Sequence, residues 1–420
     1  MEQKILKFPK NFYWGASTSA HQVEGCNKND WSLWEKTRAS KLAQKAKNNY
    51  AYLSDIWPHI KDQAEKEQNY ISGLAIDHYH KYCEDFELAK SLGLNAYRFS
   101  LEWSRIQPQP DYFDQAAITH YRQILIKLKQ LGIEPFVCLW HWPLPVWISE
   151  KGGWQHPKTL EYFQKYVELI SSEFKIEVRY WVTLNEPVIY SYESYFKGIW
   201  PPEKKGLLKF FRIVKKLIKA HKFSYAVIKK NIPEAKIGIA KNNIHFEAKH
   251  NFFINILIKK ILDWGWNNYF LQKIKNHQDF IGLNHYFHNL IDWGLDKNEN
   301  KIVSDLGWEL YPESIFYVLS DLKKFKKPVY ILENGLADLK DEKRKWFIKE
   351  TLQSVYKAID SGVDVQGYFH WSLLDNFEWD KGFWPRFGLI EVLYPSLERK
   401  IRQSAFYYAE IIKQNGLVVE

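Results

Sequence analysis

The chain has 420 residues, of which 46% are hydrophobic and 26% are charged, and its formal net charge is +10. These proportions are those of a globular protein, and they exclude a wholly disordered, collagen-like or coiled-coil chain. Every apolar stretch is shorter than the roughly 18 residues that a membrane-spanning helix requires.

Short strand-like runs alternate with longer helical runs along the whole chain. Strands are predicted at 12–16, 96–100, 135–139, 180–184, 236–240, 279–283, 329–332 and 366–369. Apolar residues at helical spacing predict helices at 78–92, 115–131, 158–173, 207–230, 310–325, 342–361 and 399–413. The interval 240–280 is less regular and contains one apolar and basic stretch, 252–262.

Eight strands that alternate with helices in one undivided chain predict an α/β fold, a (β/α)8 TIM barrel, as a single domain over residues 1–420. A doubly wound sheet is the alternative, but neither G-x-G-x-x-G nor G-x-x-x-x-G-K-[ST] occurs. The first two strands are much farther apart in sequence than the later ones. Residues 27–76 are therefore expected to form an inserted loop after strand 1, with a helix at 31–47 that walls the pocket.

In such a barrel, side chains just beyond the C-terminal ends of the strands converge on one pocket. Carboxylates, amides, histidines and tryptophans occupy these positions: His21, Gln22, Arg98, His141, Trp142, Asn185, Glu186, Asn242, Asn284, Tyr286, Glu333, Trp371, Glu378 and Trp379. Amides and carboxylates can hydrogen-bond neighbouring hydroxyls, while indole faces cover the C–H surfaces of a sugar. This composition indicates a polyhydroxylated ligand.

Two glutamates, Glu186 and Glu333, each follow a strand directly and each lie next to an asparagine. Cleavage of an acetal needs a protonated acid at the leaving oxygen and an ionised carboxylate that meets the developing oxocarbenium ion. Because both residues are glutamates, their surroundings must separate their pKa values. Arg98 and Tyr286 are expected to hold one of them ionised, while the other lies in an apolar setting.

A metal centre is the alternative use of such a cluster. His78 and His80 flank Tyr79, but this spacing does not put both imidazoles on one face of a helix, and no H-E-x-x-H or C-x-x-C accompanies them. No catalytic metal and no cofactor are therefore expected, and no G-x-S-x-G indicates a serine hydrolase. His21 and His141 are interpreted as neutral hydrogen-bond partners of hydroxyl groups.

The segments that carry these residues resemble glycoside hydrolase family 1, the retaining β-glucosidase and β-galactosidase family, in its compact archaeal and bacterial form. The matching segments cover essentially the whole chain: F-Y-W-G-A-S-T-S-A-H-Q-V-E-G (12–25), Y-R-F-S-L-E-W-S-R-I (97–106), T-L-N-E-P (183–187), D-F-I-G-L-N-H-Y (279–286), I-L-E-N-G (331–335), W-S-L-L-D-N-F-E-W (371–379) and R-F-G-L (386–389). The resemblance implies a hydrolase that removes non-reducing terminal β-linked sugars through a covalent glycosyl-enzyme.

The resemblance also implies a role for each matching residue. Glu186 would be the acid/base and Glu333 the nucleophile, positioned or tuned by Arg98, Asn284 and Tyr286. Sugar binding would fall to Gln22, His141, Trp142, Asn185, Glu378, Trp379 and Phe387, with Trp371 as a stacking floor. The intact Glu378 and Trp379 imply an unphosphorylated sugar, since a carboxylate would repel phosphate. Trp308, Trp384 and Tyr192 are candidates for lining the aglycone side.

Three positions depart from the usual family pattern. Leu332 replaces the Thr of I-T-E-N-G, His285 replaces the first Tyr of N-Y-Y, and Pro143 replaces the Asp of H-W-D-L-P. None of them removes an implied catalytic group. Leu332, which precedes the implied nucleophile, is expected to be the departure that shifts preference or rate.

Two other functions remain as alternatives: an endo-acting barrel glycosidase, and a catalytically silent sugar-binding barrel. The partners expected are small-molecule β-glycosides and oligosaccharides, with no nucleic acid, because lysine is spread along most helices. Residues 207–230 and 252–262 mix apolar residues with lysines as interfacial helices do, but barrel helices with solvated lysine faces are preferred, and membrane association is not expected. Stretch 252–262 could also pack in a homo-oligomer.

A cytoplasmic location is expected. The residues before Trp14 show no apolar segment typical of a secretory signal. The three cysteines, Cys26, Cys83 and Cys138, have no spacing typical of metal binding or of a disulfide framework, which fits a reducing compartment.

Overall fold

In the computed structural model, which describes residues 4–419, eight parallel strands close into a barrel. They follow one another around it in chain order: β2 (Tyr13–Ser17), β3 (Ala96–Ser100), β4 (Glu134–Cys138), β5 (Tyr180–Asn185), β6 (Lys236–Asn242), β8 (Ile281–Asn284), β10 (Val329–Asn334) and β11 (Val365–Trp371). Pairing of β11 with β2 closes the ring. The predicted (β/α)8 barrel is confirmed, and each predicted strand overlaps one of these eight.

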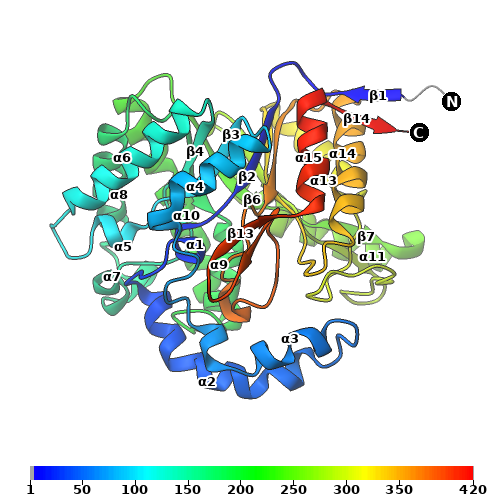
Figure 1. Cartoon of the computed structure of the whole chain (residues 1–420), viewed down its shortest axis with the longest axis horizontal. Helices are drawn as coiled ribbons and strands as arrows, with labels where there is room; N and C mark the ends of the chain where they lie inside the picture. The colour runs from blue at the N-terminus through cyan, green and yellow to red at the C-terminus, as the bar shows by residue number, and fades with distance from the viewer. Residues whose placement is uncertain (1–3, 420) are drawn as a thin grey trace.

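Longer helices alternate with the strands and cover the outside of the barrel (Figure 1). They are α4 (His78–Ser91), α6 (Gln115–Gln130), α8 (Thr159–Glu173), α10 (Leu207–Asn231), α13 (Ser314–Leu322), α14 (Arg344–Asp360) and α15 (Gln403–Gln414). Each buries one apolar stripe at helical spacing; α6, for example, buries Ile118, Tyr121, Leu125 and Leu128. Shorter helices lie in the loops: α1 (Ala20–Val23), α5 (Trp103–Ile106), α7 (Val146–Glu150), α9 (Pro187–Ser191), α11 (Phe253–Leu262) and α12 (Tyr269–Ile274).

One predicted helix begins later than expected. Residues 399–401 belong to β13 (Glu398–Ile401), which pairs antiparallel with β12 (Ile390–Leu393), and α15 begins at Gln403. The buried Arg399 side chain bonds Asp85 of α4 from this hairpin, with 2.8 Å between Nε and Oδ1. A tertiary contact has therefore overridden the local helical pattern.

The two ends of the barrel are built differently. At one end, β1 (Lys4–Lys7) pairs antiparallel with β14 (Gly416–Val419), so the two ends of the described chain lie side by side (Figure 1). At the other end, where β2 finishes, residues 27–76 form α2 (Asp30–Tyr50), α3 (Trp57–Ala64) and the 3-10 turn Glu67–Tyr70. No helix in residues 4–419 has both the length and the apolar character needed to cross a membrane.

The barrel interior is a packed aromatic core through most of its depth. Inward-facing side chains from alternate strand positions form one buried cluster that includes Phe136, Tyr180, Leu332 and Phe369. The rings of Phe136 and Tyr180 stack with 4.2 Å between centroids. Because these side chains fill the barrel, a ligand pocket has room at the C-terminal ends of the strands.

The regular strand register breaks at the two strands that carry the glutamates. The pairing of β5 with β6 shifts between Val182 and Asn185, and the pairing of β10 with β8 shifts between Ile331 and Glu333. Such irregularities turn a side chain out of the two-residue alternation. Directly after Glu333 and Asn334 comes Gly335, where a Cβ atom would lie 1.9 Å from the carbonyl oxygen of Trp371. Only glycine lets these strand ends pack so closely.

Candidate active site

A cavity of about 360 Å³ opens at the C-terminal ends of the barrel strands. Most of the predicted site residues line it: His141, Trp142, Glu186, Tyr286, Glu333, Trp371, Glu378, Trp379 and Phe387. Four others are buried next to this lining, each hydrogen-bonded to one of its residues: Gln22, Arg98, Asn185 and Asn284. The structure therefore brings all the predicted site residues to one end of the barrel, in two layers.

Glu333, at the end of β10, is held by two donors on two other strands. The guanidinium of Arg98 on β3 donates from Nη1 to Oε1, and the Tyr286 hydroxyl just beyond β8 donates to Oε2 over 2.9 Å. Arg98 is fully buried, and its other arm donates from Nη2 to Oδ1 of Asn185 at 2.5 Å. A cation and a hydroxyl donor on its two oxygens are the surroundings that suit a carboxylate anion.

Glu186 has different surroundings. It follows β5, has a positive φ of 41° and caps α9, so its side chain leaves the strand toward the cavity. Its Oε1 accepts hydrogen bonds only from neutral amides, Asn284 Nδ2 at 3.0 Å and Asn242 Nδ2 at 3.2 Å. Burial and the nearby charge of Glu333 raise the pKa of Glu186 to about 7. It can therefore carry a proton near neutral pH.

A continuous set of polar contacts connects the two glutamates. Asn284 Nδ2 donates both to Glu186 and, over 3.2 Å, to Asn185 Oδ1, which also accepts from Arg98. Asn185 in turn contacts His141, with 2.9 Å between Nδ2 and Nε2. Because β3, β5, β8 and β10 all contribute, the separation of the carboxyl groups is fixed by the barrel itself.

Aromatic rings form the walls of the cavity. The Trp142 and Trp379 rings lie 4.6 Å apart between centroids, and His141 stacks on Trp371 at 6.1 Å. Both Trp142 and Trp379 have positive φ angles, 84° and 48°, a strain that in folded proteins gathers at functional sites. Burial and the nearby Arg98 charge lower the pKa of His141 well below its usual value, so its ring is neutral.

One end of the cavity carries a carboxyl group, that of Glu378. Gln22 Nε2 donates to its Oε2 at 3.2 Å and to the backbone oxygen of Phe377 at 2.9 Å. Burial and the Asp380 carboxylate raise the pKa of Glu378 to about 8. This group is a hydrogen-bonding carboxyl enclosed by protein.

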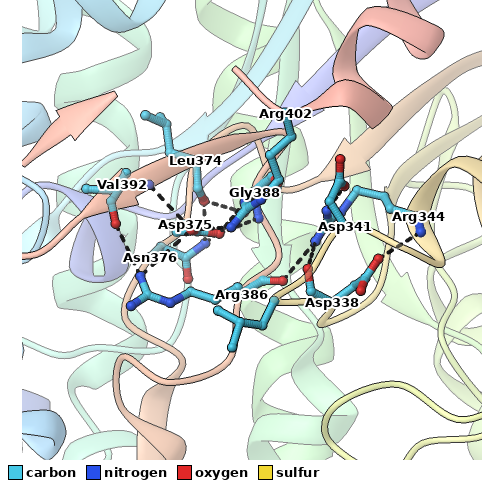
Figure 2. A network of polar contacts seen from close by, with 12 residues as sticks. Asp338, Asp341, Arg344, Leu374, Asp375, Asn376, Arg386, Gly388, Val392 and Arg402 are labelled. Atoms are coloured by element: carbon cyan, nitrogen blue, oxygen red, sulfur yellow. Dashed lines mark hydrogen bonds and ion pairs between the residues drawn. The ribbon is translucent and has the colours of Figure 1, made fainter. Parts of the chain in front are cut away.

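A buried ionic network anchors the loop that carries Glu378, Trp379 and Phe387 (Figure 2). Asp375 is fully buried and accepts both Nη groups of Arg402, at 2.8 and 2.9 Å. Burial alone would raise the pKa of Asp375, but the Arg402 charge outweighs it and lowers the pKa. Asp375 also accepts from the amide of Gly388, where a Cβ would lie 2.2 Å from the Asp375 nitrogen.

The same network reaches the loop after β10. The carbonyl oxygen of Arg386 accepts from the amide of Asp338 at 2.9 Å and from Nη2 of Arg344 at 3.0 Å (Figure 2). Phe387 lies between Arg386 and Gly388, so both of its neighbours are fixed. The loop that follows Glu333 and β10 is therefore tied to the loop that bears Glu378.

Several cavity residues were not predicted from the sequence. They come from α9, the π-helical turn after it and the loop beyond β11: Ile189, Glu193, Lys197, Ile199, Trp200, Asp380 and Lys381. Asp380 joins two of them, since it accepts from Trp200 Nε1 at 3.0 Å and from Lys381 Nζ at 2.5 Å. No local motif marks these positions, although Asp380 and Lys381 follow Glu378 directly in the sequence.

Some expectations about individual residues are wrong. His21 was expected to bond ligand hydroxyls, but both of its ring nitrogens have partners in the protein: Nε2 lies 2.7 Å from Glu35 Oε1, and Nδ1 lies 3.0 Å from Asn29 Nδ2. Trp308 lines the cavity, whereas Trp384 packs on Tyr50 and Tyr192 stacks on Phe196. Trp308 therefore lies where it was expected, whereas Trp384 and Tyr192 are not among the residues that line the cavity.

The departures from the family pattern lie outside the cavity lining. Leu332 points into the barrel core. His285 lies within hydrogen-bond distance of the Asn243 carbonyl oxygen (2.9 Å) and of Ser314 Oγ (2.7 Å), and burial lowers its pKa to about 4. The carbonyl oxygen of Pro143 accepts from Trp140 Nε1 at 2.9 Å.

Two buried glutamates with contrasting partners, in an aromatic pocket at the C-terminal end of a (β/α)8 barrel, define a glycoside hydrolase. The chain belongs to glycosyl hydrolase family 1, whose model matches residues 4–270 and 255–417. The resemblance noted from the motifs is thereby confirmed.

Known relatives match this chain over nearly its whole length. It is 32% identical over 464 residues to a 1,4-β-D-glucan glucohydrolase of Thermotoga neapolitana, covering 98% of this chain and 100% of the relative. A β-glycosidase from Pyrococcus horikoshii superposes with a TM-score of 0.87 at 34% identity, covering 99% of this chain and 96% of that one. A Thermotoga maritima β-glucosidase in complex with glucoimidazole gives 0.86 at 29% identity, covering 98% and 100%.

Proposed function

We propose that this protein is a retaining exo-β-glycosidase that releases a neutral sugar, glucose first and also galactose or fucose, from the non-reducing end of β-glycosides. The observation that carries the proposal is the contrast between the two glutamates. Glu186 holds a proton to about pH 7, while Glu333 faces the Arg98 cation and the Tyr286 hydroxyl. The names of the relatives also support a β-glucosidase.

The first step forms a covalent intermediate. A carboxylate oxygen of Glu333 attacks the anomeric carbon, the bond from that carbon to the leaving oxygen breaks, and Glu186 gives its proton to that oxygen. Loss of that proton leaves Glu186 as a carboxylate, which Asn242 and Asn284 hydrogen-bond.

The second step releases the sugar. Glu186, now ionised, takes a proton from water as the water oxygen attacks the anomeric carbon. The bond to Glu333 breaks, and the sugar leaves with its original β configuration. Each glutamate thereby returns to its starting protonation state. His141, Asn185 and Gln22 are proposed to hold the sugar hydroxyls, with Trp371 under the ring.

The closed end of the cavity favours exo action on a neutral sugar. Glu378 and Trp379 lie on the cavity wall with Gln22 bonded to Glu378, and we infer that this group closes the cavity beyond the terminal sugar of a polysaccharide. Lys381, the cation beside them, is already paired with Asp380. A phosphorylated sugar would therefore meet the Glu378 carboxyl without a free cation to balance its charge.

The experiment is a panel of nitrophenyl β-glycosides (glucoside, galactoside, fucoside, mannoside and 6-phosphoglucoside) with Glu333→Gln beside the wild type. Turnover of a neutral sugar should fall by more than about 10³-fold in Glu333→Gln, about 4 kcal/mol of barrier. The matched control is Glu203→Gln, which changes a surface residue that pairs with Arg38 and should retain full turnover. Wild-type turnover in Glu333→Gln would overturn the assignment.

Product analysis separates the remaining alternatives. Proton NMR of the first product should show the β anomer, whereas an inverting enzyme would give the α anomer. An endo-acting enzyme would shorten a soluble β-glucan before free sugar appeared. A silent sugar-binding barrel would bind glucose analogues and turn over none of the glycosides.

We also propose that the whole chain acts as one catalytic domain and that the enzyme works in the cytoplasm. Stretch 252–262 is proposed to contact a second copy of the chain in any oligomer, and not to bind a membrane. The free thiols of Cys26, Cys83 and Cys138 fit a reducing compartment. Liposome sedimentation at low and moderate salt and light scattering test the last point. Binding to vesicles at either salt concentration would contradict it.

A further inference from the structure

A small two-stranded sheet extends the barrel beyond the strands that carry Asn242 and Asn284. Strand β7 (His245–Ala248) follows β6, β9 (His288–Ile291) follows β8, and the two run parallel with His245 opposite His288. Glu247 lies two residues after His245, and residues two apart share a face of a strand. The pairing therefore gathers two imidazoles and one carboxylate on one face of this sheet.

The ligand atoms of these three residues lie close together. His288 Nε2 is 3.2 Å and His245 Nε2 is 3.8 Å from Oε2 of Glu247, and all three atoms lie within 4.8 Å of one another. The His245 and His288 side chains are only 11% and 7% exposed. Two histidines and one glutamate form a ligand set typical of zinc sites that keep a further position open.

A second carboxylate, that of Glu309, orients His288 through the ring nitrogen that does not face Glu247. Its Nδ1 lies 2.7 Å from Oε2 of Glu309, and the other oxygen of Glu309 accepts from the Asn300 amide at 3.2 Å. Histidine ligands of metals commonly donate their second ring N–H to a carboxylate in this way. With Nδ1 turned to Glu309, the Nε2 atom of His288 faces the Glu247 carboxylate. A cation between them would be coordinated by both.

The adjoining cavity has the charge that a cation requires. It measures about 450 Å³ and is lined by five glutamates, Glu247, Glu299, Glu309, Glu313 and Glu350, against the single ammonium of Lys301. The excess of carboxylates concentrates cations there. The cavity also leaves room for water in the remaining coordination positions.

We propose that His245, Glu247 and His288 bind a zinc ion or a similar divalent transition metal, with Glu309 as the partner that orients His288. None of these residues lines the cavity that holds Glu186 and Glu333. The metal would clamp β7 to β9 and thereby stabilise the rim of the barrel. Nitrogen ligands favour Zn²⁺, Co²⁺ and Ni²⁺ over Mg²⁺ and Ca²⁺.

The test is calorimetric titration of the EDTA-treated full chain with zinc chloride, together with thermal unfolding with and without zinc. One ion should bind per chain and raise the Tm. His288→Gln and His245→Gln should lose this binding, and Glu309→Gln should weaken it by about 10- to 100-fold. His80→Gln changes a histidine whose side chain is 69% exposed, and is the matched control.

Two further readouts keep the result unambiguous. Cobalt should give visible absorption bands that His288→Gln abolishes, whereas magnesium and calcium should bind weakly. Circular dichroism and glycosidase turnover should show that the variants are folded. The proposal is overturned if zinc does not bind, if it binds equally to His288→Gln, or if calcium binds as tightly. Failure to bind would mean that His288 serves only as a hydrogen-bond partner of Glu247 and Glu309.

Discussion

The Tyr286 hydroxyl donates to Oε2 of Glu333 over 2.9 Å, from the loop between β8 and β9 to the end of β10. Arg98 donates to the other oxygen, so both oxygens of this carboxylate have a fixed donor. A carboxylate held on both sides cannot rotate away from the cavity. Its orientation toward a bound sugar is therefore set before the substrate arrives.

Removing the Tyr286 hydroxyl should slow catalysis without unfolding the protein. A hydrogen bond to a charged group contributes about 1.5–3 kcal/mol, so we expect Tyr286→Phe to lower kcat by about 10- to 100-fold. Steady-state kinetics on nitrophenyl β-glucoside measure the change. Tyr407→Phe, on the outer helix α15, is the control and should keep its kcat. Unchanged turnover in Tyr286→Phe would show that Arg98 alone positions Glu333.

The pKa of Glu186 should depend on the charge of Glu333. Burial and that charge raise it to about 7, so removing the charge in Glu333→Gln should lower it. Carbon-13 NMR titration of the glutamate carboxyl groups measures this change directly. In the wild type, kcat/KM should fall as pH rises through about 7, because Glu186 then loses the proton that the leaving group needs. Glu203→Gln should change neither result.

Glu378 should make stability depend on pH. Its pKa is about 8 in the folded protein against 4.5 ordinarily, so the folded state binds the proton more tightly. This contribution to stability is fully present below pH 4.5 and is lost as pH rises through 8. A tenfold difference in proton affinity between the folded and unfolded states is worth about 1.4 kcal/mol, so Glu378→Gln should be more stable than the wild type by a few kcal/mol above pH 8.

The comparison for this prediction is thermal unfolding at pH 5 and pH 9. The advantage of Glu378→Gln should be much smaller at pH 5, where the buried carboxyl is protonated in the folded wild type. The same variant should bind sugar more weakly, because replacing a binding-site residue by a more stabilising one commonly lowers activity. A constant difference at both pH values would contradict the raised pKa.

The Asp375–Arg402 pair should be worth much more to stability than a surface pair. Arg402→Met removes the cation that donates to both oxygens of the buried Asp375 and leaves only Arg386, whose Nη1 is 3.7 Å from Oδ2, so it should cost about 3–5 kcal/mol in the free energy of unfolding. Arg38→Met, from the exposed pair with Glu203, should cost less than about 1 kcal/mol. Urea unfolding measures both. Equal losses would show that solvent reaches Asp375.

Leu332→Thr, which restores the usual family residue, should affect stability more than catalysis. Leu332 is fully buried and a Cβ on Gly282 would lie 2.3 Å from its Cδ1, so its side chain fills the barrel core. Losing that volume and burying a hydroxyl should cost about 2–4 kcal/mol. We expect kcat to stay within about threefold of the wild type, about 0.7 kcal/mol. A larger change in kcat would mean that the departure reaches Glu333.

Local patterns in the sequence were enough to predict the order of the barrel strands and the residues of the candidate site. Strand and helix periods are local properties, because each is set by which residues within one element face the core. Those periods identified all eight barrel strands, and with them the glutamates at the ends of β5 and β10. The segments around Glu186 and Glu333 also indicated a family, since each is a short run whose spacing does not depend on distant contacts.

What those residues touch follows only from the closed barrel. Arg98 and Glu333 are 235 residues apart, and barrel closure is what brings them together. Strict two-residue alternation would put the neighbours Leu332 and Glu333 on opposite faces of β10. The shift of register between Ile331 and Glu333 breaks this alternation, so Leu332 fills the barrel core while Glu333 lines the cavity. Loop packing likewise placed Lys381 in the cavity, and the pairing of β7 with β9 placed His245 beside His288. Such contacts depend on register and loop packing, which are properties of the whole fold and not of any local stretch of sequence.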